Sequence, residues 1–216
     1  MESILIGEHI NFAYNQTPIL KDISVCFEQG KVHAIVGPSG SGKTTLLCVL
    51  SGISRYKDGS IKYKGIELSK LNYSKYRKDT GIIFQNYNLI PYLNAIQNIV
   101  VAMEIGKIRG NKVNKAKELL TQVGIKENDW YRPTTKLSGG QQQRVAIARA
   151  LAIESEIIFA DEPTGNLDSK SGQEIIQLLC NLASNYKKCV ICVTHDKRIS
   201  KKADIVYTLS DGTIST

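Results

Sequence analysis

The sequence predicts an α/β fold with a parallel sheet at its core, an antiparallel β subdomain near the N-terminus and an inserted helical subdomain. Three observations support this prediction. The motif G-x-x-x-x-G-K-T at 37–44 lies between two short apolar segments, which gives the order strand, loop, helix. From Gln141 onward, near-continuous apolar segments alternate with segments of helical periodicity, which is typical of a parallel sheet covered by helices on both faces. Before and just after the motif, short alternating segments favour β structure.

The N-terminal part is rich in expected strands. Apolar residues alternate with polar or small ones at 10–14, and a second strand spans about 23–27. The segment 34–36 leads into the glycine-rich motif, and 59–64 is another short strand. Because the connections here are too short for helical crossovers, we expect this opening section to be antiparallel.

The pattern changes after the apolar residues 81–84. Two segments, 95–108 and 113–123, have helical periodicity and are separated by Gly110 and Asn111. They predict a mostly helical unit in the middle of the chain.

The last third alternates between helices and buried strands. We expect helices at 141–152 and 172–183, and strands at 157–161 and 189–194. The expected organisation is a single domain over 1–216, with the core and its β subdomain at about 1–84 and 156–216 and the helical subdomain at about 85–155.

Composition and charge narrow the class of protein. A chain of 216 residues that is 42% hydrophobic and 22% charged is ordinary for a globular protein and can bury a substantial core. The formal net charge of +8 would suit nucleic acid, an anionic membrane surface or simply a solvated surface. No run of five like charges occurs, so we expect no nucleic acid partner. We also expect no secretory signal and no membrane span, because no apolar run approaches about 18–20 residues.

The five cysteines do not indicate a disulfide framework. Cys189 and Cys192 have the spacing of a redox or zinc motif, but they lie in an expected strand. Positions three apart on a strand point to opposite faces, so both thiols cannot hold one metal without distortion. We interpret them as core cysteines.

The motif at 37–45 predicts a nucleotide site. Its glycines allow the backbone N–H groups to surround a phosphate chain, and the helix that begins near Lys43 adds its positive dipole end. Lys43 can reach the β- and γ-phosphates, and the Thr44 hydroxyl can bind Mg²⁺. The alternative is a glycine-rich turn that matches by accident. The residues expected to contact phosphate are Gly37, Ser39, Gly40, Ser41, Gly42, Lys43, Thr44 and Thr45.

A second acidic element follows a buried strand. The strand at 157–161 ends in Asp161 and Glu162, which places carboxylates at the C-terminal edge of the sheet, where open α/β sheets bind ligands. We expect Asp161 to hold Mg²⁺, through water, and Glu162 to accept a proton from an attacking water. The alternative is an acidic turn before Pro163.

The segment 137–141, LSGGQ, separates this chain from other phosphate-loop ATPases. Ser138 has the character of a helix N-cap, and Gly139 and Gly140 expose N–H groups at the start of the helix, which makes a second anion site. The alternative is a capped helix after a glycine turn. The five residues, with Gln141 as the last, resemble the signature motif of ATP-binding-cassette (ABC) ATPases, and the QQR that follows strengthens the match.

The resemblance extends over 4–214 with every motif in family order. It implies that Tyr14 stacks on adenine and that Gln85 touches Mg²⁺ and the attacking water. It implies that Asp168 belongs to a loop that crosses to a partner subunit, and that His195 contacts the γ-phosphate. Each of these residues also has a plain alternative, such as an exposed tyrosine or a capping histidine.

The resemblance implies an ABC ATPase fold and an ATP-hydrolysing subunit of a bacterial ABC transporter or mechanotransmission complex. The octapeptides 161–168 and 84–91 are similar to one branch, which includes ATPases of lipoprotein release, macrolide export, cell division and antimicrobial-peptide resistance. Two copies would enclose two ATP head to tail. Each site would combine Lys43, Thr44, Gln85, Asp161, Glu162 and His195 of one copy with Ser138 and Gly140 of the other.

The expected membrane partner is a separate permease subunit, which would hold the chain at the cytoplasmic face of the cell membrane. The resemblance places its docking surface near Asn86 to Asn98, where Tyr87, Leu89, Ile90, Tyr92 and Leu93 form a dense apolar group. The alternative is that these side chains pack the helical subdomain onto the core. Two other functions remain as alternatives, a soluble ABC-type ATPase of cofactor assembly and one of DNA maintenance.

Overall fold

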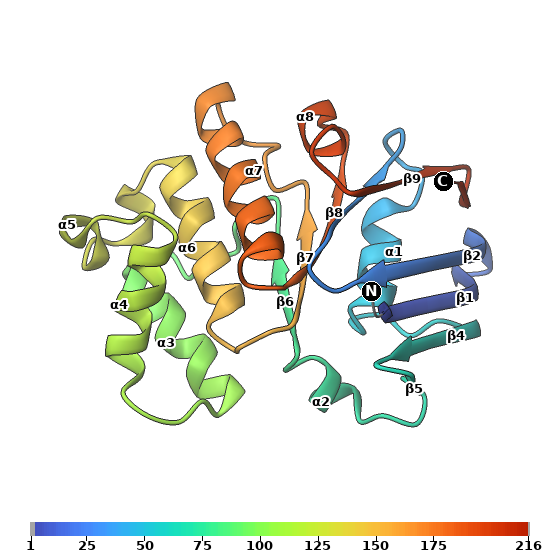
Figure 1. Ribbon diagram of the computed structural model, residues 1–216, viewed down its shortest axis with the longest axis horizontal. Helices are drawn as coiled ribbons and strands as arrows, with labels where there is room; N and C mark the ends of the chain where they lie inside the picture. The colour runs from blue at the N-terminus through green and yellow to red at the C-terminus, as the bar shows by residue number, and fades with distance from the viewer. Residues whose placement is uncertain (1–2, 216) are drawn as a thin grey trace.

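The computed structural model describes residues 3–215, which form two sheets with helices grouped mainly at one end (Figure 1). The first sheet has the strand order β2-β1-β4-β5 and is antiparallel throughout. Its strands are β1 (Ser3–Tyr14), β2 (Thr17–Glu28), β4 (Asp58–Tyr63) and β5 (Ile66–Glu67). The antiparallel pairing expected for the opening section is therefore confirmed for these strands.

The second sheet has the order β10-β9-β3-β8-β7-β6. Its strands are β3 (Val32–Val36), β6 (Thr80–Ile83), β7 (Ile157–Asp161), β8 (Cys189–Thr194), β9 (Ile205–Ser210) and β10 (Thr213–Ser215). All neighbours are parallel except β10, which runs antiparallel to β9.

The expectation that the whole opening section is antiparallel is wrong for β3. This strand lies between β8 and β9 and is parallel to both. Four of its five residues are buried, as expected for a strand covered on both faces. The short connection from β2 to β3 therefore joins two different sheets rather than neighbouring strands of one sheet.

The second sheet separates two hydrophobic cores. One core contains Ile157 and Phe159 and packs α1 (Lys43–Leu50) and the antiparallel sheet. The other contains Ile158 and Ala160 and packs the larger helices. Those helices are α3 (Ala95–Gly106), α4 (Lys112–Gln122), α6 (Gly139–Leu151) and α7 (Ser169–Ser184). A parallel sheet with both faces covered is confirmed.

The two cysteines of β8 confirm the strand argument. Cys189 lies in the core on the α1 side, whereas Cys192 lies in the core on the side of α6 and α7. Burial raises the pKa of both thiols, that of Cys192 to about 12. They are packing residues.

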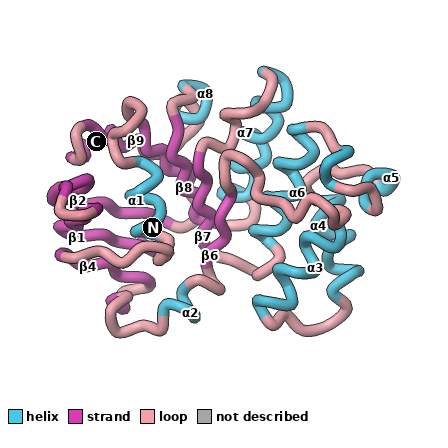
Figure 2. Tube along the Cα trace, turned by 180° about the vertical axis from the view of Figure 1, so that it is seen from behind, coloured by secondary structure: helices cyan, strands magenta, loops and turns pink. Residues whose placement is uncertain are grey.

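The helices α3, α4 and α6 lie together beyond the edge strand β6, as both views of the backbone show (Figures 1 and 2). Short α5 (Glu127–Trp130) and the 3-10 turn η1 (Thr134–Lys136) complete this group. The boundaries of the helical subdomain at 85 and 155 stay a prediction.

Several short elements were not expected from the sequence: α2 (Tyr73–Tyr76), α8 (Lys197–Ser200), β5, β9 and β10. In β9 buried and exposed positions alternate only over its second half. Within residues 3–215, no helix has the length and apolar character needed to cross a membrane.

Candidate nucleotide site

The glycine-rich loop between β3 and α1 has the backbone that its sequence predicts. Gly40 and Gly42 have φ angles of +80° and +101°, a region that other residues rarely adopt. At Gly37 the reason is space, because a Cβ atom there would lie 2.1 Å from the carbonyl oxygen of Leu209 in β9. The loop is thus shaped by conformation at two glycines and by close packing at the third.

The loop and the start of α1 carry polar groups that could bind an anion. Lys43 folds back over it, and its Nζ donates to the carbonyl oxygens of Gly37 (3.0 Å) and Pro38 (2.9 Å). The buried hydroxyl of Ser41 has no hydrogen-bond partner within residues 3–215. Gly42, the N-cap residue of α1, offers no side chain to the first amides of the helix. A phosphate chain would satisfy these groups, so the residues fit an anionic ligand.

Thr44 and Asp161 meet across the sheet, although 117 positions separate them in the sequence. The Thr44 hydroxyl donates to Oδ1 of Asp161 at 3.1 Å. Burial raises the pKa of Asp161, while the hydrogen bond from Thr44 opposes this shift. A hydroxyl beside a partly buried carboxylate fits a hard cation such as Mg²⁺.

Glu162 directly follows β7, and three groups from the end of β8 hold its carboxylate. Its Oε2 accepts from the Thr194 hydroxyl (3.0 Å) and from the backbone N–H of His195 (3.3 Å). Its Oε1 lies 2.9 Å from Nδ1 of His195. The backbone of Glu162 is left-handed, with a φ of 45°, which turns the side chain away from the path of the strand. The structure therefore brings Glu162 and His195 into direct contact.

Gln85 lies near the loop that follows Glu162. A Cβ atom added at Gly165 would lie 3.2 Å from Nε2 of Gln85. Asn166 in the same loop donates to the carbonyl oxygen of Gln85 and to the side-chain oxygen of Asn86, both at 3.0 Å. The expected grouping of Gln85 with the acidic loop is therefore present.

The expected cap at Ser138 is confirmed. Ser138 is the N-cap residue of α6 and forms a capping box with Gln141: the Gln141 N–H donates to the Ser138 hydroxyl, and the Ser138 N–H donates to the Gln141 side chain. The Gln141 amide also donates to Asp129 at 2.8 Å. Since Ser138 is exposed, the amides of Gly139 and Gly140 are available at the surface.

Some predicted site residues do not meet the phosphate loop. Asp168 caps α7 by accepting from the Ser171 N–H, and hydrogen bonds from Ser171 lower its pKa. Tyr14 is the last residue of β1 and is 52% exposed. The helices α1 and α6 lie on opposite sides of β6 and β7 (Figures 1 and 2). Ser138 and Lys43 therefore stand at the starts of helices that lie on opposite sides of these strands.

Sequence reasoning missed three residues that organise this site. Thr194 binds Glu162, Asn166 binds Gln85, and Arg149 of α6 donates to the carbonyl oxygens of Tyr87 and Asn88. Thr194 and Asn166 lie inside segments that the motifs already single out. No sequence signal indicates Arg149, because its partners are backbone atoms 61 and 62 positions away.

Fold and site together define a phosphate-loop ATPase with a separate, exposed signature motif. The family model for ABC transporters matches residues 20–165. YclH of Bacillus subtilis, an ABC transporter ATP-binding protein described as uncharacterized, is 43% identical over 99% of this chain and 96% of its own. LolD of Cytophaga hutchinsonii, a lipoprotein-releasing system ATP-binding protein, is 38% identical over 99% of this chain and 100% of its own.

A longer relative and a solved structure indicate the same family. MacB of Agrobacterium fabrum, a macrolide export ATP-binding/permease protein, is 44% identical over 91% of this chain, which matches only 31% of that protein's length. A dimeric post-hydrolysis structure of the ATP-binding cassette MJ0796, bound to ADP and Pi, superimposes with a TM-score of 0.87 at 35% identity and covers 98% of this chain and 97% of that one. The chain therefore belongs to the ABC transporter family, and its fold and motifs are those of the family's ATP-binding, ATP-hydrolysing subunits.

Proposed function

We propose that two copies of this chain close around two ATP molecules and use hydrolysis to drive a separate membrane protein. The observation that carries the proposal is the arrangement at the ends of β7 and β8. There the Thr44–Asp161 pair lies beside a carboxylate, Glu162, that Thr194 and His195 hold in place. This supplies a cation site and a general base one residue apart.

Each residue at this site has a role that its contacts support. Lys43 and the loop amides bind the phosphates, and Thr44 and Asp161 hold Mg²⁺, which neutralises phosphate charge when it is bound. Glu162 accepts the proton of the attacking water, because its side chain is largely buried and fixed by three hydrogen bonds. Gln85 orients that water, and His195 contacts the γ-phosphate. Tyr14 stacks on the adenine.

The second copy completes the site. Ser138 and Gly140 lie at the N-terminus of α6, a position that favours an anion, and α6 lies on the opposite side of β6 and β7 from α1, which follows the phosphate loop. A head-to-tail pair would bring this helix end onto the phosphates held by the partner's loop, with Asp168 close to the joint. The structure of the relative MJ0796 in a post-hydrolysis state is dimeric and bound to ADP and Pi.

The membrane partner would dock near residues 86–98. Among the apolar residues of this segment, Leu89 packs against the core, so it is less suited to bind a partner. Tyr92 is 81% exposed and is the better candidate for an anchor residue. Beside this segment, a cavity of about 370 Å³ lies between β6, α3 and α6 and is lined by Ile82, Phe84, Asn88, Ala102, Ala150 and Ile153, among others. A largely apolar cavity that Asn88 of this segment helps to line suits a short helix of a partner, which would hold this chain at the cytoplasmic face of the membrane.

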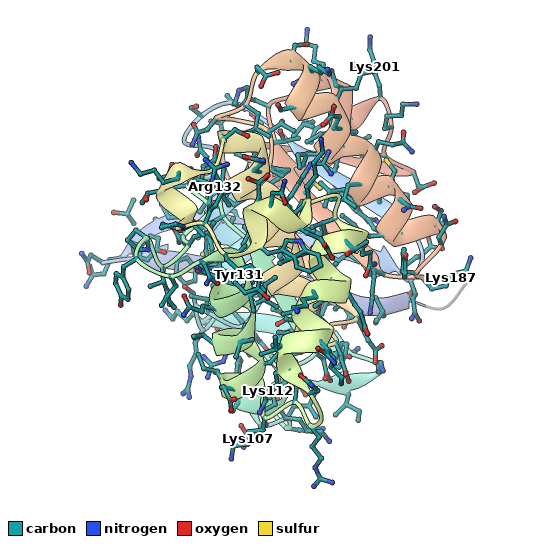
Figure 3. All side chains as sticks on the ribbon, turned by 90° about the vertical axis from the view of Figure 1, so that its left-hand side faces the viewer. Lys107, Lys112, Tyr131, Arg132, Lys187 and Lys201 are labelled. Carbon is teal, nitrogen blue, oxygen red and sulfur yellow. The ribbon has the colours of Figure 1, made fainter. Side chains whose placement is uncertain are left out.

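The docking part of the proposal is tested by co-expressing this chain with a candidate partner permease and purifying the permease from membranes. Tyr92→Asp should reduce co-purification at least about tenfold, the size expected for one lost anchor residue at an interface. Tyr131→Asp is the matched control, because Tyr131 is 63% exposed and lies outside the proposed surface (labelled in Figure 3). Equal recovery of both variants would contradict this docking surface, and a chain that never associates with membranes would favour a soluble ATPase of cofactor assembly.

A further inference from the structure

The segment that follows Gln85 has an unusual backbone. Tyr87 and Asn88 are consecutive residues with φ angles of 59° and 49°, in the left-handed region. Asparagine tolerates this region, but a bulky tyrosine does so rarely and at a cost of about 1 kcal/mol or more. Something in the surrounding structure must hold two such residues in sequence.

Arg149 of α6 supplies that restraint. Its guanidinium donates through one nitrogen to the carbonyl oxygen of Tyr87 at 2.8 Å and through the other to that of Asn88. The ion pairs of arginines within residues 3–215 involve Arg132, Arg144 and Arg198, and not Arg149. Burial lowers the pKa of Arg149, so this cation loses solvation without gaining a carboxylate. Burying this cation costs solvation free energy, and what the structure gains is that the carbonyl groups of Tyr87 and Asn88 are held in place.

The same segment is attached on its other side. Asn166 holds Gln85 and Asn86 from the loop that follows Glu162. The hydroxyl of Tyr87 lies against Gly139, where an added Cβ atom would come within 2.9 Å of it. The backbone around Gln85 is thus fixed between the acidic loop and the helix that begins at Ser138.

We propose that Arg149 is a positioning residue for Gln85. By holding the Tyr87 and Asn88 carbonyls, it fixes the left-handed turn and so sets the direction from which the Gln85 side chain enters the site. Asn88 and Arg149 also line the cavity beside β6, so a partner seated there would contact this turn directly. The inference rests on the proposed role of Gln85 in hydrolysis.

The primary test compares Arg149→Gln with Arg144→Gln in the purified full chain. Arg144 is the matched control, because it also lies on α6, donates to a backbone carbonyl (that of Val123) and pairs with Glu174, but does not touch 85–88. Arg149→Gln should lower kcat for ATP hydrolysis by about tenfold to a hundredfold, the usual cost of a misplaced group, with KM changed less than about threefold. Arg144→Gln should keep kcat within about threefold of wild type.

Two further measurements separate positioning from simple destabilisation. Hydrogen exchange at the amides of 86–89 should become faster in Arg149→Gln and not in Arg144→Gln. Adding Asn88→Gly to Arg149→Gln should recover part of the lost kcat, because glycine adopts positive φ without strain. Where Arg149→Gln does not fold, Arg149→Lys carries the same tests, since one ammonium cannot reproduce the planar fork.

The outcomes separate the two proposals. An unchanged kcat in Arg149→Gln, or an equal loss of kcat in Arg144→Gln, would overturn the positioning role. The proposed function fails instead if the wild-type chain hydrolyses no ATP, or if Glu162→Gln hydrolyses as fast as wild type.

Discussion

The carboxylate of Glu162 lies 2.9 Å from the imidazole Nδ1 of His195 and 3.0 Å from the hydroxyl of Thr194. The residue that follows β7 therefore contacts both the last residue of β8 and the first residue of the loop after β8. Since Thr194 is fully buried whereas the His195 side chain is 72% exposed, Thr194 is the fixed support and His195 the part that a ligand can reach.

Removing that support should slow hydrolysis. Thr194→Val keeps the shape of the side chain but deletes the donor to Glu162, so the carboxylate becomes less well placed. We expect kcat to fall about tenfold with little change in KM, within the range that misplacement of a catalytic group costs. Thr194→Ser, which keeps the hydroxyl, is the control in steady-state ATPase assays. A Thr194→Val protein as active as Thr194→Ser would contradict the supporting role.

Neutralising Glu162 should separate binding from chemistry. Glu162→Gln keeps the size of the side chain but cannot accept the water's proton, so hydrolysis should slow at least about a hundredfold, as expected for a lost general base. ATP affinity should stay near the wild-type value, because Glu162 does not bind the phosphates in this account. Glu174→Gln, on the outer part of α7, is the control. If Glu162→Gln turns over at nearly the wild-type rate, Glu162 is not the base.

In the proposed dimer, Lys43 of one copy and Ser138 of the other would share one composite site. Mixing a Lys43→Ala chain with a Ser138→Arg chain should place both lesions in one site of the mixed dimer and leave the other site intact. Neither variant should hydrolyse ATP alone. Each mixed dimer keeps one intact site of two, so it should have up to about half of the activity of a wild-type dimer if one site works alone. Full activity of Ser138→Arg by itself would remove Ser138 from the partner's site.

Asp196 should make stability depend on pH in the acid range. Hydrogen bonds from Arg198 lower the pKa of Asp196 to about 2, and the Thr164 hydroxyl binds the same carboxylate. Because the folded state prefers the ionised form, the stabilisation is full above about pH 4, the usual pKa region, and is lost as the pH falls toward 2.

Urea denaturation of wild type and Asp196→Asn at several pH values checks this. At pH 7 we expect the variant to be less stable by about 1–2 kcal/mol, and the difference should shrink between about pH 4 and pH 2. A difference that stays constant or grows on acidification would show that Asp196 does not act through its charge.

Local features of this chain could be predicted from the sequence because they depend on neighbouring residues. The phosphate loop needs glycines at fixed positions, and the Ser138–Gln141 capping box lies within four residues. Thr44 and Asp161 were expected to bind Mg²⁺ in one site, and the structure joins them by a hydrogen bond.

The features that were missed depend on contacts between distant segments. Whether β3 joins the first or the second sheet is decided by its pairing with β8, which begins more than 150 positions later. Arg149 binds backbone oxygens, which carry no side-chain identity that a motif could reveal. Hydrophobic periodicity gives the type of an element, but it does not give its partner.

The central claim, that two copies close around ATP, is tested most directly by light scattering on Glu162→Gln. With ATP and Mg²⁺ this protein should have twice the monomer mass of 23.9 kDa, and with ADP it should return to the monomer mass. Adding Ser138→Arg to the same chain should prevent the ATP-dependent dimer, because the cationic side chain would block the anion site at the start of α6. A Glu162→Gln protein that binds ATP and remains a monomer at concentrations well above its ATP Kd would contradict the claim.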